Sequence, residues 1–270
     1  MRPVVDHVPY AVRDLDEAIA RFERVGLAPM YGGTHGDGAT EMALVPLPDG
    51  TYVELIAATG EGEPGFWPAA IEAGDGPCAW CVQTGSVHTE LQRFITHDVR
   101  VDGPQRASRD RPDGTHVEWD MGFLGSDERE VLPFLIADRT PREYRVPDSE
   151  LYGSPLSGVG WVVIAVRDLA SAIEQFARLY RLPEPETDVD THFGEMAWFP
   201  EQAFVLAEPT DEPLLDRLES SGPGPAALFL SAEMDRATDQ FPLTGGRSLF
   251  DRRLAFFEGF DHQLGVVSRR

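Results

Sequence analysis

Side chains able to bind an acidic substrate, ligate a metal ion or transfer a proton fall in short patterned segments of this sequence. His116 and Glu118 are two residues apart in an alternating segment, so they share one face if that segment is a strand. Arg106, Arg109 and Arg111 precede them, and a guanidinium group can clamp a carboxylate. We therefore treat Arg109, His116 and Glu118 as candidate substrate-binding residues, with a solvated surface as the alternative.

A glycine-rich segment at residues 32–38 (GGTHGDG) carries another histidine, His35. Its composition is typical of a flexible loop, and loops at a cavity mouth often contact substrate. We expect His35 to bind substrate, ligate a metal ion or act as a general acid or base. An ordinary exposed loop histidine is the alternative.

Cys78 and Cys81 have the spacing of a C-x-x-C redox motif. That chemistry needs the first cysteine at a helix N-terminus, whereas this segment has the pattern of a strand. Residues three apart on a strand point to opposite faces and lie ~10 Å apart, which is beyond the reach of a disulfide. We do not expect a redox function.

The composition excludes two classes of partner. The chain has 46 acidic and 23 basic residues, a net charge of -23, and no lysine. Phosphate backbones and anionic lipids repel such a chain, so we expect neither nucleic acid nor a membrane as a partner. The acidic composition suits a halophilic protein in a salt-rich cytoplasm. The alternative is a moderately acidic protein from a genome with GC-rich codons. An early charge at Arg2 argues against a signal peptide, and short apolar segments argue against a membrane span, so we expect a cytoplasmic protein.

The sequence repeats itself at an offset of 154 residues. Residues 11–15 (AVRDL) recur at 165–169, and residues 41–43 (EMA) recur at 195–197. A repeat in a single register indicates an internal duplication. We expect two domains, at residues 1–147 and 155–270, joined by a proline- and glycine-containing linker.

Each copy begins with a strand pattern that leads into a helix. Residues 4–12 are rich in β-formers, Asp14 is placed as an N-cap, and Glu17 completes the capping-box spacing. Short strands are then expected at residues 28–33, 40–47 and 51–57, which makes a βαβββ unit. Similar orders follow from Pro77, Gly158 and Ala226. The prediction is an α+β fold of four βαβββ modules that form two tandem curled mixed-sheet cups.

In these elements the sequence resembles the vicinal oxygen chelate superfamily, which includes glyoxalase I, extradiol dioxygenases and bleomycin-resistance proteins. Residues 7–15 (HVPYAVRDL), the amphipathic helix after them and residues 52–56 (YVELI) carry this resemblance. Residues 32–35 (GGTH) and 132–138 (LPFLIAD) are similar, more narrowly, to the glyoxalase-like domain proteins of that superfamily.

The resemblance implies one divalent metal ion between two modules, with a ligand from the first and the last strand of each. His7 and Glu54 fall on the first two ligand positions. Imidazole nitrogen and carboxylate oxygen suit Zn, Mn, Ni or Fe. Such an ion chelates two neighbouring substrate oxygens and stabilises an enolate or alkoxide.

The other two ligand positions match the family less well. The third holds Cys78, Ala79 or Trp80, and alignment of residues 52–56 with 132–136 puts Phe134 on the fourth, which cannot bind a metal. Three protein ligands are the usual minimum for a catalytic metal. Cys78, His35 or the pair of His116 and Glu118 would complete the set.

The second copy lacks both of the secure ligands. At the offset of 154 residues Trp161 replaces His7, and alignment puts Val205 opposite Glu54. A residue needed only for the fold should leave a trace in both copies. We therefore expect the active cavity in the first copy and a scaffolding or lid role for the second.

The resemblance implies a lyase, isomerase or dioxygenase that acts on a small molecule with two adjacent oxygens, with Glu54 and His35 as catalytic residues. A small-molecule binding protein that performs no chemistry, as the bleomycin-resistance proteins do, is the alternative. A third interpretation is a structural role in which the acidic surface and the second half support a homodimer.

Overall fold

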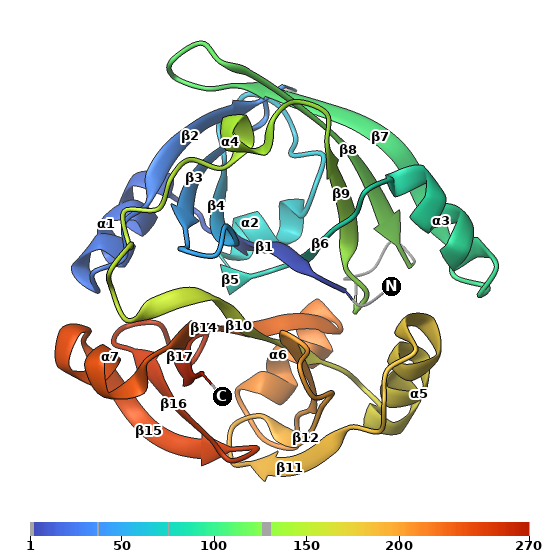
Figure 1. The fold of residues 1–270 in the computed structure, drawn as a ribbon, viewed down its shortest axis with the longest axis vertical. Coiled ribbons are helices and arrows are strands. Elements are labelled where there is room, and N and C mark those ends of the chain that lie inside the picture. Colours follow the sequence, from blue (N-terminus) through green and yellow to red (C-terminus); the bar gives the residue numbers. More distant parts are fainter. Residues whose placement is uncertain (1–2, 37, 75, 126–130, 270) are drawn as a thin grey trace.

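Two curled mixed sheets with helices on their outer sides make up the molecule, one above the other along its long axis (Figure 1). We describe a computed structural model that covers residues 3–36, 38–74, 76–125 and 131–269. The sheets use successive parts of the chain, β1–β9 and β10–β17. The α+β fold of four modules in two cups is therefore confirmed.

The first sheet closes into a barrel, because β4 pairs with both β3 and β1. Its order is β4-β3-β2-β7-β8-β9-β6-β1, with β5 beside β1. The strands are β1 (Val5–Ala11), β2 (Met30–His35), β3 (Thr40–Pro46), β4 (Tyr52–Ala58), β5 (Gly76–Pro77), β6 (Cys81–Gln83), β7 (Val101–Asp110), β8 (His116–Leu124) and β9 (Phe134–Asp138).

The two modules of this barrel meet at β2 and β7, through a short antiparallel ladder. Two pairs of described residues form it, Thr34 with Asp110 and His35 with Arg109. At the opposite side β1 pairs with β4 in parallel and with β6 in antiparallel orientation. The ring therefore has no open edge between the modules.

The helices of the first half are α1 (Leu15–Arg24), α2 (Pro68–Ala73), α3 (Val87–Ile95) and the short α4 (Arg142–Arg145). The Asp14 carboxylate accepts a hydrogen bond of 2.8 Å from the Glu17 amide, which confirms the N-cap. Its counterpart Asp168 caps α5 in the same way, through the Ser171 amide. Helix α4 lies in the segment that we had expected to be a linker, and the sequence patterns did not indicate α2.

The second sheet is a half-barrel with the order β11-β12-β13-β10-β14-β17-β16-β15. Its elements are β10 (Leu156–Ala165), α5 (Leu169–Tyr180), β11 (Glu186–Asp190), β12 (Gly194–Trp198), β13 (Phe204–Glu208), α6 (Leu214–Ser221), β14 (Gly224–Ala232), α7 (Met234–Gln240), β15 (Leu243–Leu249), β16 (Arg252–Phe257) and β17 (Leu264–Ser268). The edge strands β11 and β15 do not pair as β2 and β7 do. Side chains join them instead, because Arg247 and Asp190 form an ion pair of 2.9 Å.

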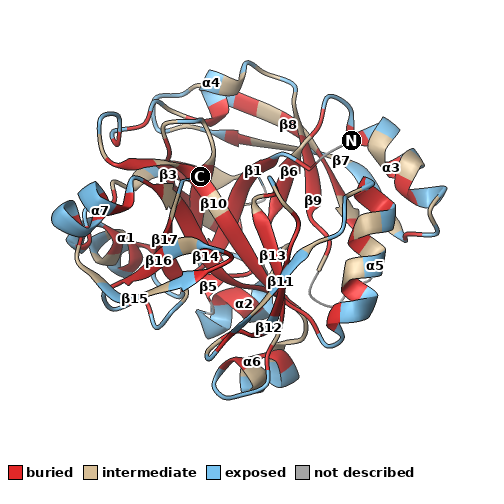
Figure 2. Ribbon diagram, turned by 60° about the horizontal axis from the view of Figure 1, so that its bottom comes forward, coloured by how far each residue is buried: buried red, intermediate tan, exposed pale blue. Residues whose placement is uncertain are grey.

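A single hydrophobic core runs through the junction of the two halves. It includes Val8 and Trp80 of the barrel together with Val162, Phe176 and Phe204 of the half-barrel. The Trp80 ring packs 5.4 Å from that of Phe204, and the two sheets present buried residues to each other (Figure 2). Burial of this shared apolar surface stabilises both halves together.

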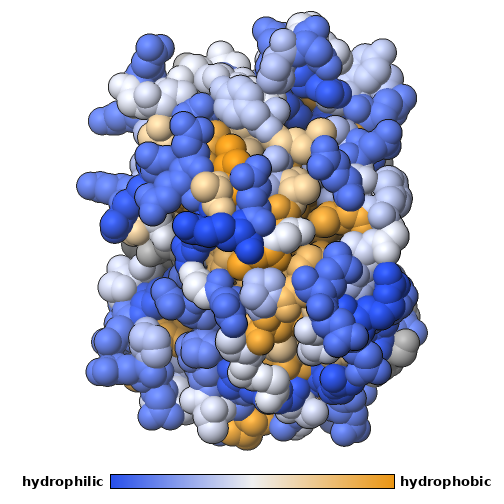
Figure 3. All heavy atoms as spheres, turned by 90° about the vertical axis from the view of Figure 1, so that its left-hand side faces the viewer, coloured by the Kyte–Doolittle hydropathy of each residue, from blue (hydrophilic) through white to orange (hydrophobic). Residues whose placement is uncertain are grey.

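The outer surface is predominantly hydrophilic on the side that Figure 3 shows. On one side of the molecule apolar atoms gather at mid-height, where the halves meet (Figure 3). Among the described residues, no helix is both long and apolar enough to span a bilayer.

Candidate functional site

The first barrel encloses a cavity of about 430 Å³. Polar side chains gather on one part of its wall, and apolar side chains such as Trp119 and Met121 cover the rest. The polar lining consists of His7, His35, Thr40, Tyr52, Glu54, Gln105, Arg106, Ser108, Arg109 and Arg145. A cavity of this size that combines apolar walls with a few charged groups is typical of a small-molecule site.

His7 and Glu54 face each other in this cavity because β1 and β4 are neighbours. The parallel ladder pairs His7 with Tyr52 and Pro9 with Glu54, so the two side chains come from adjacent strands. His7 Nε2 lies 3.3 Å from Glu54 Oε2, and both residues are buried. The Tyr52 ring stacks on the imidazole with centroids 4.5 Å apart, which fixes the plane of the His7 ring.

His35 approaches the same carboxylate from the end of β2. Its Nε2 lies 3.4 Å from Glu54 Oε1, and its Nδ1 forms a hydrogen bond of 2.8 Å with the Thr40 hydroxyl. The carboxylate of Glu54 therefore lies between two imidazoles. The structure thus brings together three residues that the sequence analysis had placed in different segments.

The other nitrogen of His7 is held by a neighbouring residue on β1, Asp6. Val5 pairs with Val82 and His7 with Cys81, so Asp6 is an extra residue in a β-bulge. This bulge allows Asp6 to contact the histidine that follows it, and His7 Nδ1 donates a hydrogen bond of 2.8 Å to Asp6 Oδ1.

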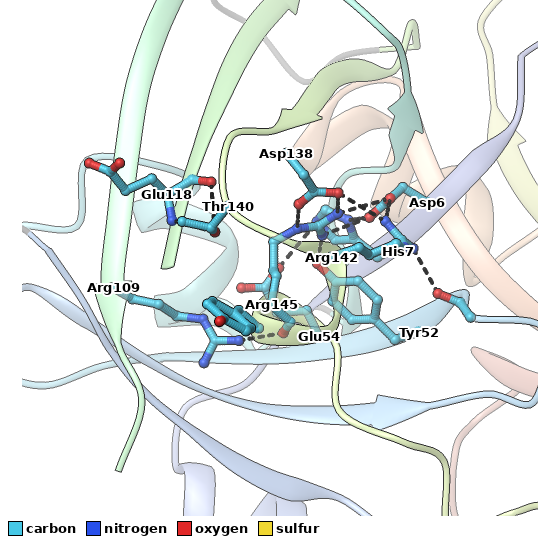
Figure 4. Close-up of polar contacts among 12 residues, drawn as sticks. Asp6, His7, Tyr52, Glu54, Arg109, Glu118, Asp138, Thr140, Arg142 and Arg145 are labelled. Carbon is cyan, nitrogen blue, oxygen red and sulfur yellow. Dashed lines mark hydrogen bonds and ion pairs between the residues drawn. The ribbon is translucent and has the colours of Figure 1, made fainter. Parts of the chain in front are cut away.

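A buried ion-pair network surrounds Asp6 (Figure 4). Arg145 donates to both oxygens of Asp6, at 2.9 and 3.1 Å, and also to Asp138 and to the Tyr52 hydroxyl. Arg142 donates to Asp6 and to the Gly50 carbonyl oxygen. The linker helix α4 thereby fixes β1, β4 and β9 around His7.

Arg109 lines the cavity on the opposite module. It is only 3% exposed. Its guanidinium donates to the carbonyl oxygen of Gly32 and, at 2.6 Å, to that of Arg145. Among the described residues no carboxylate forms an ion pair with it, although Glu54 and Tyr52 lie near enough to affect its pKa.

Charged neighbours determine the protonation states around His7. Burial opposes ionisation of Glu54, but the two imidazoles lower the pKa of this carboxyl below its usual value. Burial also opposes the charged form of His7, whereas Tyr52, Cys81 and the hydrogen bond to Asp6 raise the pKa of this imidazole well above its usual value. Burial raises the pKa of the Cys81 thiol to about 11. The site therefore keeps a carboxylate at Glu54 and a neutral thiol at Cys81.

Three of the expected site residues lie away from the cavity. Cys78 is buried in an apolar cluster beside β1, where its sulfur contacts the Pro9 carbonyl oxygen at 3.6 Å. His116 and Glu118 lie on the outer face of β8, and the His116 side chain is 56% exposed. They contact Asp110 and Arg106, which leaves the inner face of β8 to apolar residues.

The strand register of the second module shows which of its residues face one another. β6 pairs with β9 so that Cys81 is opposite Phe134 and Gln83 is opposite Ile136. Phe134, which we expected at the fourth ligand position, lines the cavity, and its ring lies 5.4 Å from that of His7. Its side chain offers no metal ligand.

Several residues of the site were not expected from the sequence. Asp6, Arg142 and Arg145 escaped because a local pattern does not show that a linker helix returns to the barrel. Phe66 and Trp67 line the cavity from the segment before α2. The one signal for these two residues in the sequence was the presence of large apolar side chains in a segment rich in glycine and proline.

The second half has no equivalent cavity site among its described residues. Val163 pairs with Val205 as Pro9 pairs with Glu54, which supports the expected alignment. Trp161, the counterpart of His7, is fully buried in an apolar cluster with Trp198 and Phe250. The concave face of the half-barrel is therefore filled by its own side chains.

Two sets of side chains could hold a metal ion. Within the described residues, Asp6, His7 and Cys81 have donor atoms that all lie within 4.8 Å of one another, so this buried group could bind a metal. Both oxygens of Asp6 already accept hydrogen bonds from arginine, however, and burial raises the pKa of the Cys81 thiol to about 11, which opposes the thiolate that a metal would bind. The second set is His7, Glu54 and His35, whose Nε2 and carboxylate atoms face the cavity.

The second set has donor types that suit a metal ion, two imidazoles and one carboxylate. His7 Nε2 lies 3.3 Å from Glu54 Oε2, and His35 Nε2 lies 3.4 Å from Glu54 Oε1, so each imidazole contacts a different oxygen of the carboxylate. Each Nδ1 is held by a second residue, as in most histidine ligands. The two imidazoles would still have to approach each other, because their donors do not form a compact group as they stand.

Comparison with protein families gives one match. Residues 5–180 match the family described as "Glyoxalase-like domain". A search of curated proteins found no match.

Solved structures match this chain at low sequence identity. A hypothetical protein from Staphylococcus aureus is 14% identical, with a TM-score of 0.63 and 98% of both chains covered. A xylose isomerase-like TIM barrel/4-hydroxyphenylpyruvate dioxygenase fusion protein is 14% identical with a TM-score of 0.55; the match covers 100% of this chain and 49% of that one. A methylmalonyl-CoA epimerase from Streptomyces coelicolor is 19% identical with a TM-score of 0.38, over 52% of this chain and 100% of that one.

Proposed function

Because the chain belongs to the glyoxalase-like domain family, we propose that it is an enzyme that converts a small oxygen-bearing molecule in the cavity of its first barrel. We further propose that His7, Glu54 and His35 hold a divalent metal ion there. The observation that supports this proposal most directly is the carboxylate of Glu54 between two buried or half-buried imidazoles, each with its Nε2 toward it.

The metal would supply Lewis acidity, which polarises a substrate oxygen and stabilises the negative charge that develops on it. Zn, Mn, Ni and Fe all accept two imidazoles and one carboxylate. The reaction class would be that of a lyase, an isomerase or a dioxygenase.

The residues around the ligands prepare the site for this chemistry. Asp6 holds the Nδ1 proton of His7, so that Nε2 faces the cavity, and Thr40 has the same role for His35. Arg145 keeps Asp6 in place and orients the Tyr52 ring that stacks on His7. Movement of these groups would disturb the reactive geometry, which must be held within a fraction of an ångström.

The apolar part of the cavity would exclude water from the reacting atoms. Phe66 stacks on Phe123 at 5.1 Å, and Trp67 lies 5.5 Å from Phe134, so aromatic rings cover the wall beyond the polar cluster. A water-poor wall strengthens the electrostatic effect of the charged groups.

A binding protein without chemistry is the second candidate. The second module contributes Phe134 and Ile136 to the cavity wall, and neither side chain can ligate a metal. A cavity with these residues could retain a ligand by burial and polar contacts alone.

Metal titration of the purified protein tests the first candidate. We expect one Zn, Mn, Ni or Fe ion per chain by calorimetry and elemental analysis, with binding lost or weakened at least ~10-fold in His7→Ala, Glu54→Ala and His35→Ala. His116→Ala is the matched control, because its side chain is exposed and lies outside the cavity. Equal metal affinity in all four variants, or no binding by the wild type, would contradict the metal proposal and favour the binding protein.

A further inference from the structure

The cavity contains an arginine whose charge no carboxylate of the described residues balances. Arg106, Arg109 and Arg145 line it, whereas Glu54 is the only acidic residue among the described residues of its lining. Arg145 is paired with Asp6 and Asp138, and Arg106 is paired with Glu118. Arg109 alone donates only to backbone carbonyl oxygens.

A buried cation in this position needs an explanation. Arginine is almost never fully buried without an anionic partner, because removal of a charge from water carries a large desolvation penalty. Arg109 is 3% exposed, in a protein whose net charge is -23 and which has many carboxylates to pair with arginine. Within the part of the chain that the structure describes, none of these carboxylates forms an ion pair with the Arg109 guanidinium.

The position of Arg109 is fixed by the closure of the barrel. The β2–β7 ladder pairs it with His35, and the carbonyl oxygens of Gly32 and Arg145 orient its guanidinium. The guanidinium has N–H groups beyond the two that these carbonyl oxygens accept. Arg106, on the same strand, is paired with Glu118, and its side chain is 58% exposed.

The rest of the wall indicates what the anion is attached to. Phe66, Trp67, Trp119 and Met121 line the cavity, and these side chains favour an apolar body. We propose that the ligand of this cavity is a small carboxylate with an apolar body, whose carboxylate binds the guanidinium of Arg109. This inference deepens the function proposed above and rests on it for the chemistry, because the other end of such a ligand would reach Glu54 and the two histidines.

A pair of probes that differ only in charge tests the inference by calorimetry. The probes are 3-phenylpropanoate and its neutral amide, 3-phenylpropanamide. In the wild type we expect the acid to bind at least ~10-fold more tightly than the amide, as a charge-assisted contact to arginine predicts. In Arg109→Met the affinity for the acid should fall about 10- to 100-fold, whereas that for the amide should stay within about twofold.

Two further variants complete the experiment. Arg111→Met is the matched control: Arg111 follows β7, contacts the Glu143 and Tyr144 carbonyl oxygens, and should leave both affinities unchanged. Arg109→Lys keeps the charge without the planar fork and should bind the acid with intermediate affinity. Equal affinities of the wild type for acid and amide would overturn the inference. A parallel loss of both in Arg109→Met would do so as well, because it would show a structural role.

The test is independent of the metal. Glu54→Gln should retain the preference for the acid even where metal binding is lost. A protein that prefers the acid through Arg109 but binds no metal contradicts only the function proposed above, and one that binds a metal without this preference contradicts only the carboxylate assignment.

Discussion

His35 and Arg109 are direct partners in the ladder that closes the first barrel. The residue that contacts Glu54 and the residue with the unbalanced charge therefore come from the same point of the fold. In the second half β11 and β15 do not form this ladder, and Val189, the counterpart of His35, is 72% exposed. The ladder that closes the barrel therefore also brings these two site residues together.

Gly33→Ala should weaken this closure. Gly33 has a φ of +103°, and a Cβ there would lie 2.6 Å from the Asp110 carbonyl oxygen of the neighbouring strand. Strain and the backbone clash together should lower the free energy of unfolding by about 2–3 kcal/mol, measured by urea denaturation. Gly50→Ala, also at positive φ but with nothing within 4 Å, should cost only about 1 kcal/mol. Similar costs for both would show that the contact with β7 is unimportant.

Arg145→Met should be strongly destabilising. It would leave Asp6 and Asp138 without the buried arginine that pairs with both. Loss of one partner in a buried ion pair costs about 3–5 kcal/mol, which should appear as a lower midpoint of urea unfolding. The matched change Arg106→Met removes a pair whose arginine side chain is 58% exposed, and it should cost at most about 1 kcal/mol. Comparable losses in the two variants would contradict the importance of the buried network.

Trp161→Ala should reduce stability without a change in the site. Trp161 is fully buried between Trp198 and Phe250, so its removal leaves a large void that costs about 3–5 kcal/mol. Metal affinity at temperatures well below unfolding should stay within about twofold of the wild type, because the cavity is lined by residues 7–145. A specific loss of metal binding in the folded variant would assign the second half a part in the site.

His192 should make the protein less stable in mild acid. Burial, His262 and Arg247 lower its pKa to about 4, while Asp190 acts in the opposite direction. The folded state then binds fewer protons than the unfolded state between the usual pKa, ~6.5, and about 4. The stability that the neutral His192 ring contributes is therefore complete above pH ~6.5 and is lost as the pH falls toward 4. Because the ring is only partly buried, solvent screening reduces the effect to about 1–2 kcal/mol.

The difference between the wild type and His192→Gln isolates this contribution from other titrations. Urea unfolding at several pH values between 4 and 7 should show the wild type losing stability relative to the variant as pH falls. A constant difference across that range would contradict the lowered pKa.

Local patterns sufficed for much of the fold. The repeat, the Asp14 cap and the alternation of apolar residues predicted four modules and two cups. Each of these features can be recognised along the sequence without knowing which strands pair. His7, Glu54 and His35 were identified as site candidates from residue type and family resemblance, and the structure places them around one carboxylate.

The other positions of the site depend on long-range pairing. The bulge at Asp6 and the pairing of β1 with β6 place Cys81, and not the expected Cys78, beside His7. Arg145 approaches the site from a helix 138 residues after His7, and the sequence around it resembles an ordinary linker. These relationships exist only once distant strands are aligned.

The duplication allows the two copies to differ in how densely they are packed. A barrel with an interior of about 430 Å³ forgoes many van der Waals contacts that a solid interior would make. The sister copy has the opposite property, since aromatic rings occupy its concave face. One core joins them, so the cohesion of the solid copy also supports the hollow one. The molecule can therefore be well packed although the first copy contains a cavity, because side chains fill the concave face of the second copy.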